Sequence, residues 1–212
     1  MENILYVERK DIEDFICSDD ILFIGKDHAE FPPMVESIMN NIQVGPRSEL
    51  ESDPSKKQII PYIVITKNLC KQVFMTRRLS SQTEKRLRGS YSLGVGGHAE
   101  EVDMGGDFIF NAAIRELNEE VCVENVEHMK RVGFINNDTD SVGKVHLGVI
   151  YHISCEDVSV REKDKMSGGW VKWVDVSRFN MEVWSKMIAG IQAQLSSDSF
   201  PHVYNPINGE CY

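Results

Sequence analysis

The segment from Arg115 to Glu120, which reads Arg-Glu-Leu-Asn-Glu-Glu, constrains this chain more than any other. A helix advances by about 100° per residue, so Glu119 and Glu120 lie one turn beyond Glu116 and the three carboxylates share one sector. Like charges at this spacing repel by roughly a few tenths of a kcal/mol per pair. A hard divalent cation would turn that repulsion into attraction. The segment therefore predicts a metal site, with a solvated acidic helix face as the alternative.

The sequence before this segment supplies a glycine loop and a further acid. A strand-like run over residues 91–95 leads into Gly96, Gly97 and His98. Glycines allow a backbone to approach a ligand closely. Asp107 precedes Arg115 by eight positions, and Ala112 and Ala113 give the helix a thin face that can pack tightly against a sheet. The predicted order is strand, glycine loop, acid and acidic helix.

At these residues the chain resembles the Nudix hydrolase family of MutT-like phosphohydrolases, whose signature reads G-x5-E-x7-R-E-U-x-E-E-x-G-U, with U a bulky apolar residue. The second half matches in register at Arg115, Glu116, Leu117, Glu119, Glu120 and Val123. Three departures stand out: Asp107 replaces Glu, Cys122 replaces Gly, and nine residues rather than five separate Gly97 from Asp107. We interpret the longer spacing as a four-residue insertion around residues 101–106. Such a loop lengthens cheaply because closure entropy grows slowly with length.

The resemblance implies an α/β (α+β) fold in which a mixed β-sheet is sandwiched between helices. We assign this Nudix-like domain to residues 58–195, after a polar run over residues 45–57. Residues 1–57 are predicted to form an N-terminal α/β extension that adds a layer or a dimer surface, and residues 196–212 to form a C-terminal tail. The chain is therefore expected to be one globule with an extension, and a homodimer is an open alternative.

The resemblance also implies a reaction, namely hydrolysis of a diphosphate linkage by water with the help of Mg²⁺ or Mn²⁺. The substrate would be a nucleoside diphosphate derivative or a similar small organic diphosphate. Glu116, Glu119 and Glu120 are the predicted metal ligands, and Glu162 is a candidate for a further one. Glu119 or Glu120 would also accept the proton of the attacking water. Arg115 would pair with Glu119 and orient it.

Substrate contacts are predicted at the glycine loop and in a basic stretch. The candidate residues are Gly96, Gly97, His98, Arg77, Arg78, Arg86 and Arg88. A phosphate clamp needs such arginines, although a solvated basic surface is the alternative reading. Two rival functions remain open. One is a catalytically silent nucleotide sensor, which Asp107, Cys122 and the longer loop favour, and the other is an isomerase of isoprenoid diphosphates.

Composition narrows the class of partner. The chain has 212 residues with 42% hydrophobic content, enough to bury a full core, and it has no apolar run that could span a bilayer. The net charge of −10 argues against a nucleic-acid polymer as partner. The N-terminal residues show no signal peptide, so a cytoplasmic protein is expected. The five cysteines lack a C-x-x-C pair, which favours reduced thiols.

Periodicity predicts the elements that carry these residues. Expected helices cover residues 10–16, 32–39, 107–121 and 183–195. Expected strands cover residues 4–7, 21–24, 59–66, 73–76, 91–95, 129–135 and 145–154.

Overall fold

The computed structural model describes residues 2–16, 21–79, 90–161 and 163–192, together with the pairs 204–205 and 210–211. The chain divides into two compact units. The first comprises Met1–Tyr62, Gly97–Ala113 and Arg131–Ile150, and the second comprises Ile63–Gly96, Ile114–Lys130 and Tyr151–Tyr212. Among the described residues, no helix combines the length and apolar character needed to cross a membrane.

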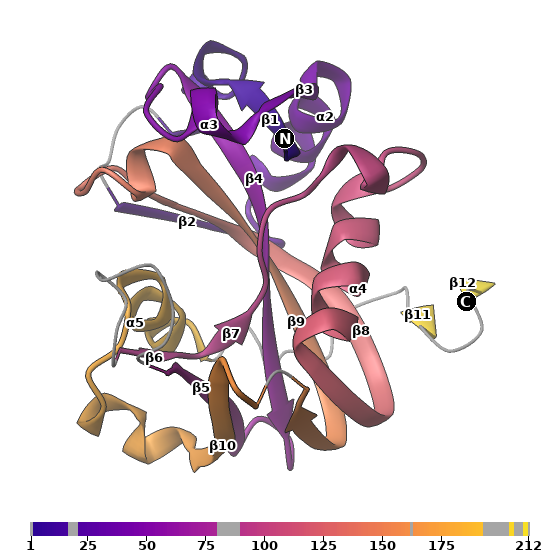
Figure 1. Cartoon of the computed structure of the whole chain (residues 1–212), viewed down its shortest axis with the longest axis vertical. Coiled ribbons are helices and arrows are strands. Elements are labelled where there is room, and N and C mark those ends of the chain that lie inside the picture. Colours follow the sequence, from indigo (N-terminus) through magenta and orange to yellow (C-terminus); the bar gives the residue numbers. More distant parts are fainter. Residues whose placement is uncertain are drawn as a thin grey trace. The chain divides into compact units, whose positions relative to one another are not determined.

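The elements are shown in Figure 1. The first unit contains β1 (Asn3–Glu8), η1 (Arg9–Asp11), α1 (Glu13–Ile16), β2 (Ile21–Gly25), α2 (Phe31–Asn41), β3 (Gln43–Pro46), α3 (Arg47–Leu50), η2 (Glu101–Asp103) and η3 (Gly143–Val145). The second contains β5 (Gln72–Arg78), β6 (Tyr91–Ser92), β7 (Gly94–Val95), β10 (Met166–Lys172), η4 (Trp173–Arg178), α5 (Val183–Gly190), β11 (Tyr204–Asn205) and β12 (Glu210–Cys211). Residues of both units belong to β4 (Lys56–Lys67), α4 (Phe108–Glu120), β8 (Val121–Asn137) and β9 (His146–Val160).

In the first unit, β1 pairs antiparallel with both β3 and β4, and β2 pairs antiparallel with the end of β8. Tyr6 marks the register of β1, since it faces Gln43 of β3 on one side and Gln58 of β4 on the other. The run from Ile4 to Val7 in β1 is buried on both faces of the strand, which is why its sequence is continuously apolar instead of alternating. Ile4, Tyr6 and Leu50 form one buried cluster of this unit.

In the second unit, β5 pairs antiparallel with β10, with β6 and with the end of β4, while β7 pairs with the middle of β4. The turn between β4 and β5 places Asn68, Leu69 and Cys70 at positive φ. A single parallel bridge links Tyr91 to Met181. Strand β7 is followed directly by Gly96 and Gly97, the glycines of the loop before α4.

The predicted fold class is confirmed, because the chain forms a mixed α+β fold with a mixed sheet and helices. The strands expected at residues 4–7, 21–24, 59–66 and 73–76 correspond to β1, β2, β4 and β5. The helices expected at residues 32–39 and 107–121 correspond to α2 and α4.

Other predicted boundaries were wrong. The helix expected over residues 10–16 is broken at Ile12, whose side chain is fully buried between η1 and α1. Strand β8 begins directly after α4, at Val121 instead of residue 129. Its first half is only partly buried and mixes polar with apolar residues, so its sequence gives little hydrophobic signal. Strand β9 extends to Val160, because its last residues alternate between exposed and buried after the continuous apolar run has ended. Helix α5 ends at Gly190, and residues 193–195 lie outside the described part.

The polar run over residues 45–57 is built into the first unit as the end of β3, α3 and the start of β4. Lys57 in this run is fully buried. The division of the chain at residues 57/58 stays a prediction, as does the tail over residues 196–212, of which only β11 and β12 are described.

Candidate functional site

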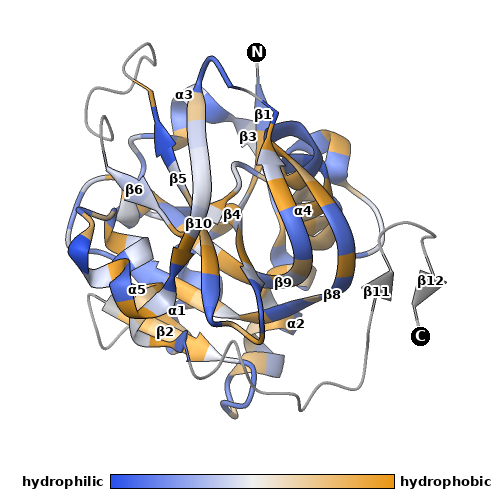
Figure 2. Ribbon diagram, turned by 90° about the horizontal axis from the view of Figure 1, so that it is seen from below, coloured by the Kyte–Doolittle hydropathy of each residue, from blue (hydrophilic) through white to orange (hydrophobic). Residues whose placement is uncertain are grey.

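The acidic segment forms the last turns of α4, as its sequence predicts. The helix begins after Asp107, whose side-chain Oδ1 accepts the backbone N–H of Phe110 at 3.1 Å and so caps one of the otherwise unpaired amides. Apolar and polar bands alternate along α4 in Figure 2. Its buried apolar side chains are Phe108, Ile109, Ala112, Ala113 and Leu117. Burial of this stripe leaves the glutamates on another face.

Arg115 joins two of the three glutamates in the second unit. Its Nη1 donates to Glu116 Oε1 at 2.8 Å and to Glu119 Oε1 at 3.4 Å. The Glu116 side chain is 11% exposed and that of Glu119 is 58% exposed, so the two carboxylates differ strongly in access to water. One guanidinium therefore balances a buried and an exposed carboxylate. The predicted pairing of Arg115 with Glu119 is present, and the shorter contact is to Glu116.

Glu120 contacts the glycine loop. Its Oε2 accepts the backbone N–H of Gly96 at 3.1 Å, across 24 positions of sequence. Gly96 has a φ of 149°, a conformation that side-chain-bearing residues rarely adopt. The glycine at this position thus lets the chain turn its amide toward the carboxylate. The glycine loop and the acidic turn of the predicted motif meet at this hydrogen bond.

Arg161 fixes the end of the helix and was not predicted. Its backbone N–H donates to the carbonyl oxygen of Glu120 at 2.9 Å, and its Nε donates to the carbonyl oxygen of Val121 at 3.1 Å. Carbonyls at the C-terminus of a helix lack partners within the helix and carry partial negative charge, so a guanidinium suits them. The only signal in the sequence was that Arg161 precedes Glu162.

The glutamates are chemically suited to a hard divalent cation, because carboxylate oxygens are the ligands that Mg²⁺ and Mn²⁺ prefer. Among the described residues, however, no group of three or more His, Cys, Asp or Glu side chains converges on one point that could hold a metal ion. Arg115 occupies part of the positions that a cation would take beside Glu116 and Glu119. The donor set fits the metal, and its side chains would have to reorient around it.

Two predicted residues of the loop and helix start have other partners, all in the first unit. Asp107 accepts two hydrogen bonds from Nη2 of Arg131, at 2.6 and 2.7 Å. His98 Nε2 lies 2.9 Å from Gln58 Oε1 and 3.2 Å from His146 Nε2. Burial lowers the pKa of His146, which favours the neutral form of its imidazole.

The insertion before α4 is an ordered loop of the first unit. The Glu100 and Asp103 side chains form a reciprocal capping box around η2. Asn111 then donates to the carbonyl oxygens of Asp103 at 3.0 Å and Gly105 at 2.8 Å. Gly105 has a φ of 116°, which explains a glycine at this point of the loop. The longer spacing is thus accommodated by local hydrogen bonds.

The basic candidates are only partly described. Arg77 is exposed and its guanidinium lies 5.4 Å from the centre of the Tyr91 ring, a cation–π contact. Arg78 ends β5 and is opposite Met166 of β10. Arg86, Arg88 and Glu162 lie outside the described residues. Their roles, like those of the other predicted site residues, stay predictions.

Comparison with known proteins identifies the family. No family profile matches the chain. Protein YmaB of Bacillus subtilis (strain 168) is 33% identical over 175 residues, which cover 77% of this chain and 82% of YmaB. The crystal structure of Tm1382, which is described as a Nudix hydrolase, is 30% identical with a TM-score of 0.76 and covers 92% of this chain and 100% of Tm1382. The chain belongs to the Nudix hydrolase family.

Membership in the Nudix family confirms the resemblance seen at Arg115 to Glu120, and with it the enzyme class of Nudix-type phosphohydrolases. The Nudix domain of Shewanella oneidensis NrtR, solved with ADP-ribose, has the same fold with a TM-score of 0.51 at 15% identity, over 65% of this chain and 86% of the NrtR domain. The structure explains why cysteine can replace the glycine of the family signature at position 122. Cys122 is the second residue of β8 and does not have a positive φ. A glycine is not required there.

Proposed function

We propose that this chain hydrolyses a phosphoanhydride linkage in a nucleoside diphosphate derivative or a similar small organic diphosphate, with Mg²⁺ or Mn²⁺ as cofactor. The observation that supports the proposal is the acidic end of α4 in a member of the Nudix family: it carries Glu116, Glu119 and Glu120, and Glu120 accepts the backbone N–H of Gly96. A chain with a net charge of −10 would repel a diphosphate unless cations lay between them. The acidic turn provides the place for those cations.

Glu116, Glu119 and Glu120 would hold the cation. When bound, the metal would neutralise substrate phosphates and lower the pKa of a water molecule, which makes hydroxide available near neutral pH. The exposed Glu119 and the Gly96-oriented Glu120 are the candidates to accept the proton of the attacking water. Arg115 would orient Glu116 and Glu119, and Arg161 would fix the backbone at Glu120.

The substrate's phosphates would approach the glycine loop. Backbone N–H groups beside glycine can contact a phosphate because no side chain intervenes. Arg77 and Arg78 are further candidates for phosphate contacts, together with Arg86 and Arg88. Base or sugar recognition depends on loops, so the substrate screen should vary both the base and the sugar.

The test is a screen of nucleoside diphosphate derivatives with Mg²⁺, with release of monophosphate or phosphate as the readout. Glu120→Gln should lower kcat/KM by about 100-fold or more, since it removes a charge that the transition state requires. Glu124→Gln is the matched control, because Glu124 is an exposed glutamate of β8 close in sequence. The control should stay within about twofold of the parent. Equal activity of all three proteins would refute the assignment of Glu120.

A nucleotide-sensing role is the alternative, and two contacts favour it. Asp107, which stands where the family has Glu, is committed to Arg131, and Arg115 already neutralises Glu116 and Glu119. Calorimetry with Mg²⁺ and the same compounds separates the two functions. Tight binding of a nucleotide without cleavage at any pH from about 6 to 9 would favour the sensor.

A further inference from the structure

A second polar site lies in the first unit and shares no residue with the proposed hydrolytic site. It is an open hollow of about 690 Å³ lined by Arg9, Pro54, Asp138, Thr139 and Lys144. These residues come from η1, from the turn before β4, and from the loop between β8 and η3 together with η3 itself. None of them was singled out in the sequence.

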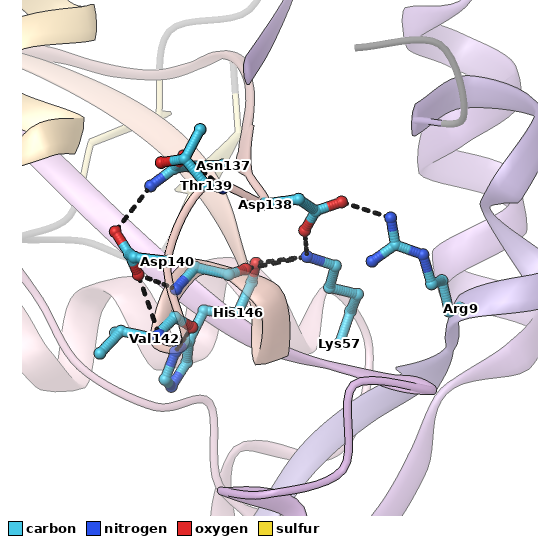
Figure 3. Close-up of polar contacts among 9 residues, drawn as sticks. Arg9, Lys57, Asn137, Asp138, Thr139, Asp140, Val142 and His146 are labelled. Atoms are coloured by element: carbon cyan, nitrogen blue, oxygen red, sulfur yellow. Dashed lines mark hydrogen bonds and ion pairs between the residues drawn. The ribbon is translucent and has the colours of Figure 1, made fainter. Parts of the chain in front are cut away.

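Asp138 is the buried acid of this hollow, and both of its oxygens are occupied. Figure 3 shows Arg9 and Lys57 meeting at its carboxylate. The Nζ of Lys57 donates to Oδ1 at 2.7 Å, and Nη2 of Arg9 donates to Oδ2. Burial alone would raise the pKa of Asp138, but the hydrogen bonds from Arg9 and Lys57 lower it to about 2. The carboxylate therefore stays charged and has two cations as partners.

Lys57 is a structural member of this cluster. It is fully buried, and besides Asp138 it donates to the carbonyl oxygens of Gly143 at 2.9 Å and His146 at 3.3 Å. These three acceptors satisfy the three protons of an ammonium group. Lys57 thus fastens the loop after β8 to β4. This structural role explains Lys57 and Asp138, and leaves Arg9 and Lys144 to be explained.

The hollow retains hydrogen-bond donors after these contacts are made. Among the described residues, Nε and Nη1 of Arg9 and Nζ of Lys144 have no hydrogen-bond or ion-pair partner. The acid next to Lys144 in this loop, Asp140, has its oxygens turned to Asn137 and to the N–H groups of Val142 and Gly143. The wall therefore offers positively charged donors while its acidic oxygens are already used.

We propose that this hollow binds the phosphate group of a small phosphorylated molecule through Arg9 and Lys144. The free edge of a guanidinium and a nearby ammonium are the groups that proteins use for phosphate oxygens. The volume lies within the range of roughly 300–1,000 Å³ that small-molecule sites occupy. The negative charge of Glu13 attracts Arg9 and would repel an incoming anion. The site shares no residue with the hydrolytic one and needs no metal.

The test is a ¹H–¹⁵N NMR titration of the full chain with inorganic phosphate and, separately, with adenosine monophosphate, in the presence of a chelator. Saturable shifts are expected at the amides of Thr139 and Lys144. Lys144→Glu should weaken binding by about tenfold or more because it replaces a donor by a repelling charge. Lys172→Glu is the control, since Lys172 is exposed and does not line the hollow, and it should leave the affinity within about twofold.

Two further variants separate binding from folding. Arg9→Lys keeps a cation for Asp138 but loses the planar fork, so it should weaken phosphate binding while the spectrum stays folded. Glu13→Gln should strengthen binding, an effect that a purely structural cluster would not show. Binding of both compounds indicates an organic phosphate, and binding of inorganic phosphate alone indicates the free ion. The proposal is overturned if no saturable shift occurs, if shifts appear only near Gly96 and Glu120, or if Lys144→Glu binds like the parent.

Discussion

The two units contain polar clusters of opposite arrangement. In the first unit two cations, Arg9 and Lys57, share one carboxylate, that of Asp138. In the second unit two carboxylates, Glu116 and Glu119, share one guanidinium, that of Arg115. The first cluster has one positive charge more than it has negative charges, and the second has one negative charge more than it has positive charges. The first surplus suits an anion and the second suits a cation.

The clusters differ in how deeply the charges are buried. Lys57 is fully buried and the Asp138 side chain is 9% exposed, whereas the Glu119 side chain is 58% exposed. A buried charge that loses its partner remains in a medium that solvates it poorly, while an exposed charge is solvated by water. The first cluster should therefore matter mainly for stability, and the second mainly for chemistry.

The largest expected effect is on stability in the first cluster. Asp138→Asn removes the carboxylate that Arg9 and Lys57 share, so it should lower the free energy of unfolding by about 3 kcal/mol. Urea unfolding measures this loss. Asp175→Asn, which breaks the surface pair with Arg178, is the control and should cost under about 1 kcal/mol. A change of less than about 0.5 kcal/mol in Asp138→Asn would show that the cluster is not energetically important.

Acid should remove the same contribution in the parent protein. The pKa of Asp138 is lowered from 3.8 to about 2 on folding, so below pH 4 the unfolded chain takes up a proton before the folded chain does. Stability from Asp138 is thus present above pH 4 and is lost as the pH falls toward 2. Unfolding curves across this window should be steeper in pH for the parent than for Asp138→Asn. Parallel curves would contradict the lowered pKa.

His152 in the second unit makes the choice of pH window important. Burial lowers the pKa of His152 from 6.5 to about 3, so the unfolded chain takes up a proton at this side chain before the folded chain does. The free energy of unfolding therefore falls as the pH drops below 6.5, a wider pH range than that of Asp138. That dependence should persist in Asp138→Asn and diminish in His152→Asn.

The second cluster should respond through activity. Arg115→Gln leaves Glu116 and Glu119 without their shared cation, so we expect kcat/KM to fall by about tenfold as the carboxylates lose their orientation. Without Arg115 the carboxylates of Glu116 and Glu119 repel each other more strongly, so the rise in Tm on adding Mg²⁺ should be larger in this variant than in the parent. Arg178→Gln serves as control. An unchanged rate in Arg115→Gln would remove Arg115 from the site.

The smallest expected effect sharpens the contrast most. Glu120→Gln is the same acid-to-amide change as Asp138→Asn, yet without metal its Tm should equal or slightly exceed that of the parent. The amide oxygen can still accept the N–H of Gly96, and one repelling charge is gone. Differential scanning calorimetry with a chelator measures this. A large loss of Tm would mean that Glu120 is a structural residue.

Much of α4 could be predicted from the sequence alone. The cap at Asp107, the helical spacing of its apolar stripe and the spacing of its acidic turn are all local along the chain, so the sequence pattern reports them directly. The family signature at Arg115 to Glu120 could be read for the same reason, because it lies in one continuous helix, and the comparison with Tm1382 confirmed it. Strands such as β1 and β4 were found from their continuous apolar runs. The first half of β8 was missed, since a partly buried strand that mixes polar with apolar residues has no such run.

Only the tertiary structure decided which distant groups meet. The hydrogen bond from Gly96 to Glu120 and the ion pair of Asp107 with Arg131 each join residues 24 positions apart, and Lys57 reaches Asp138 across 81 positions. No local pattern marks Lys57 as buried, because a lysine in a polar run is ordinarily solvated. Its burial depends on a carboxylate and two carbonyls that the fold brings to it. The sequence by itself thus determined the helix and its charge, while packing between distant segments determined which charges are paired and which are left for ligands.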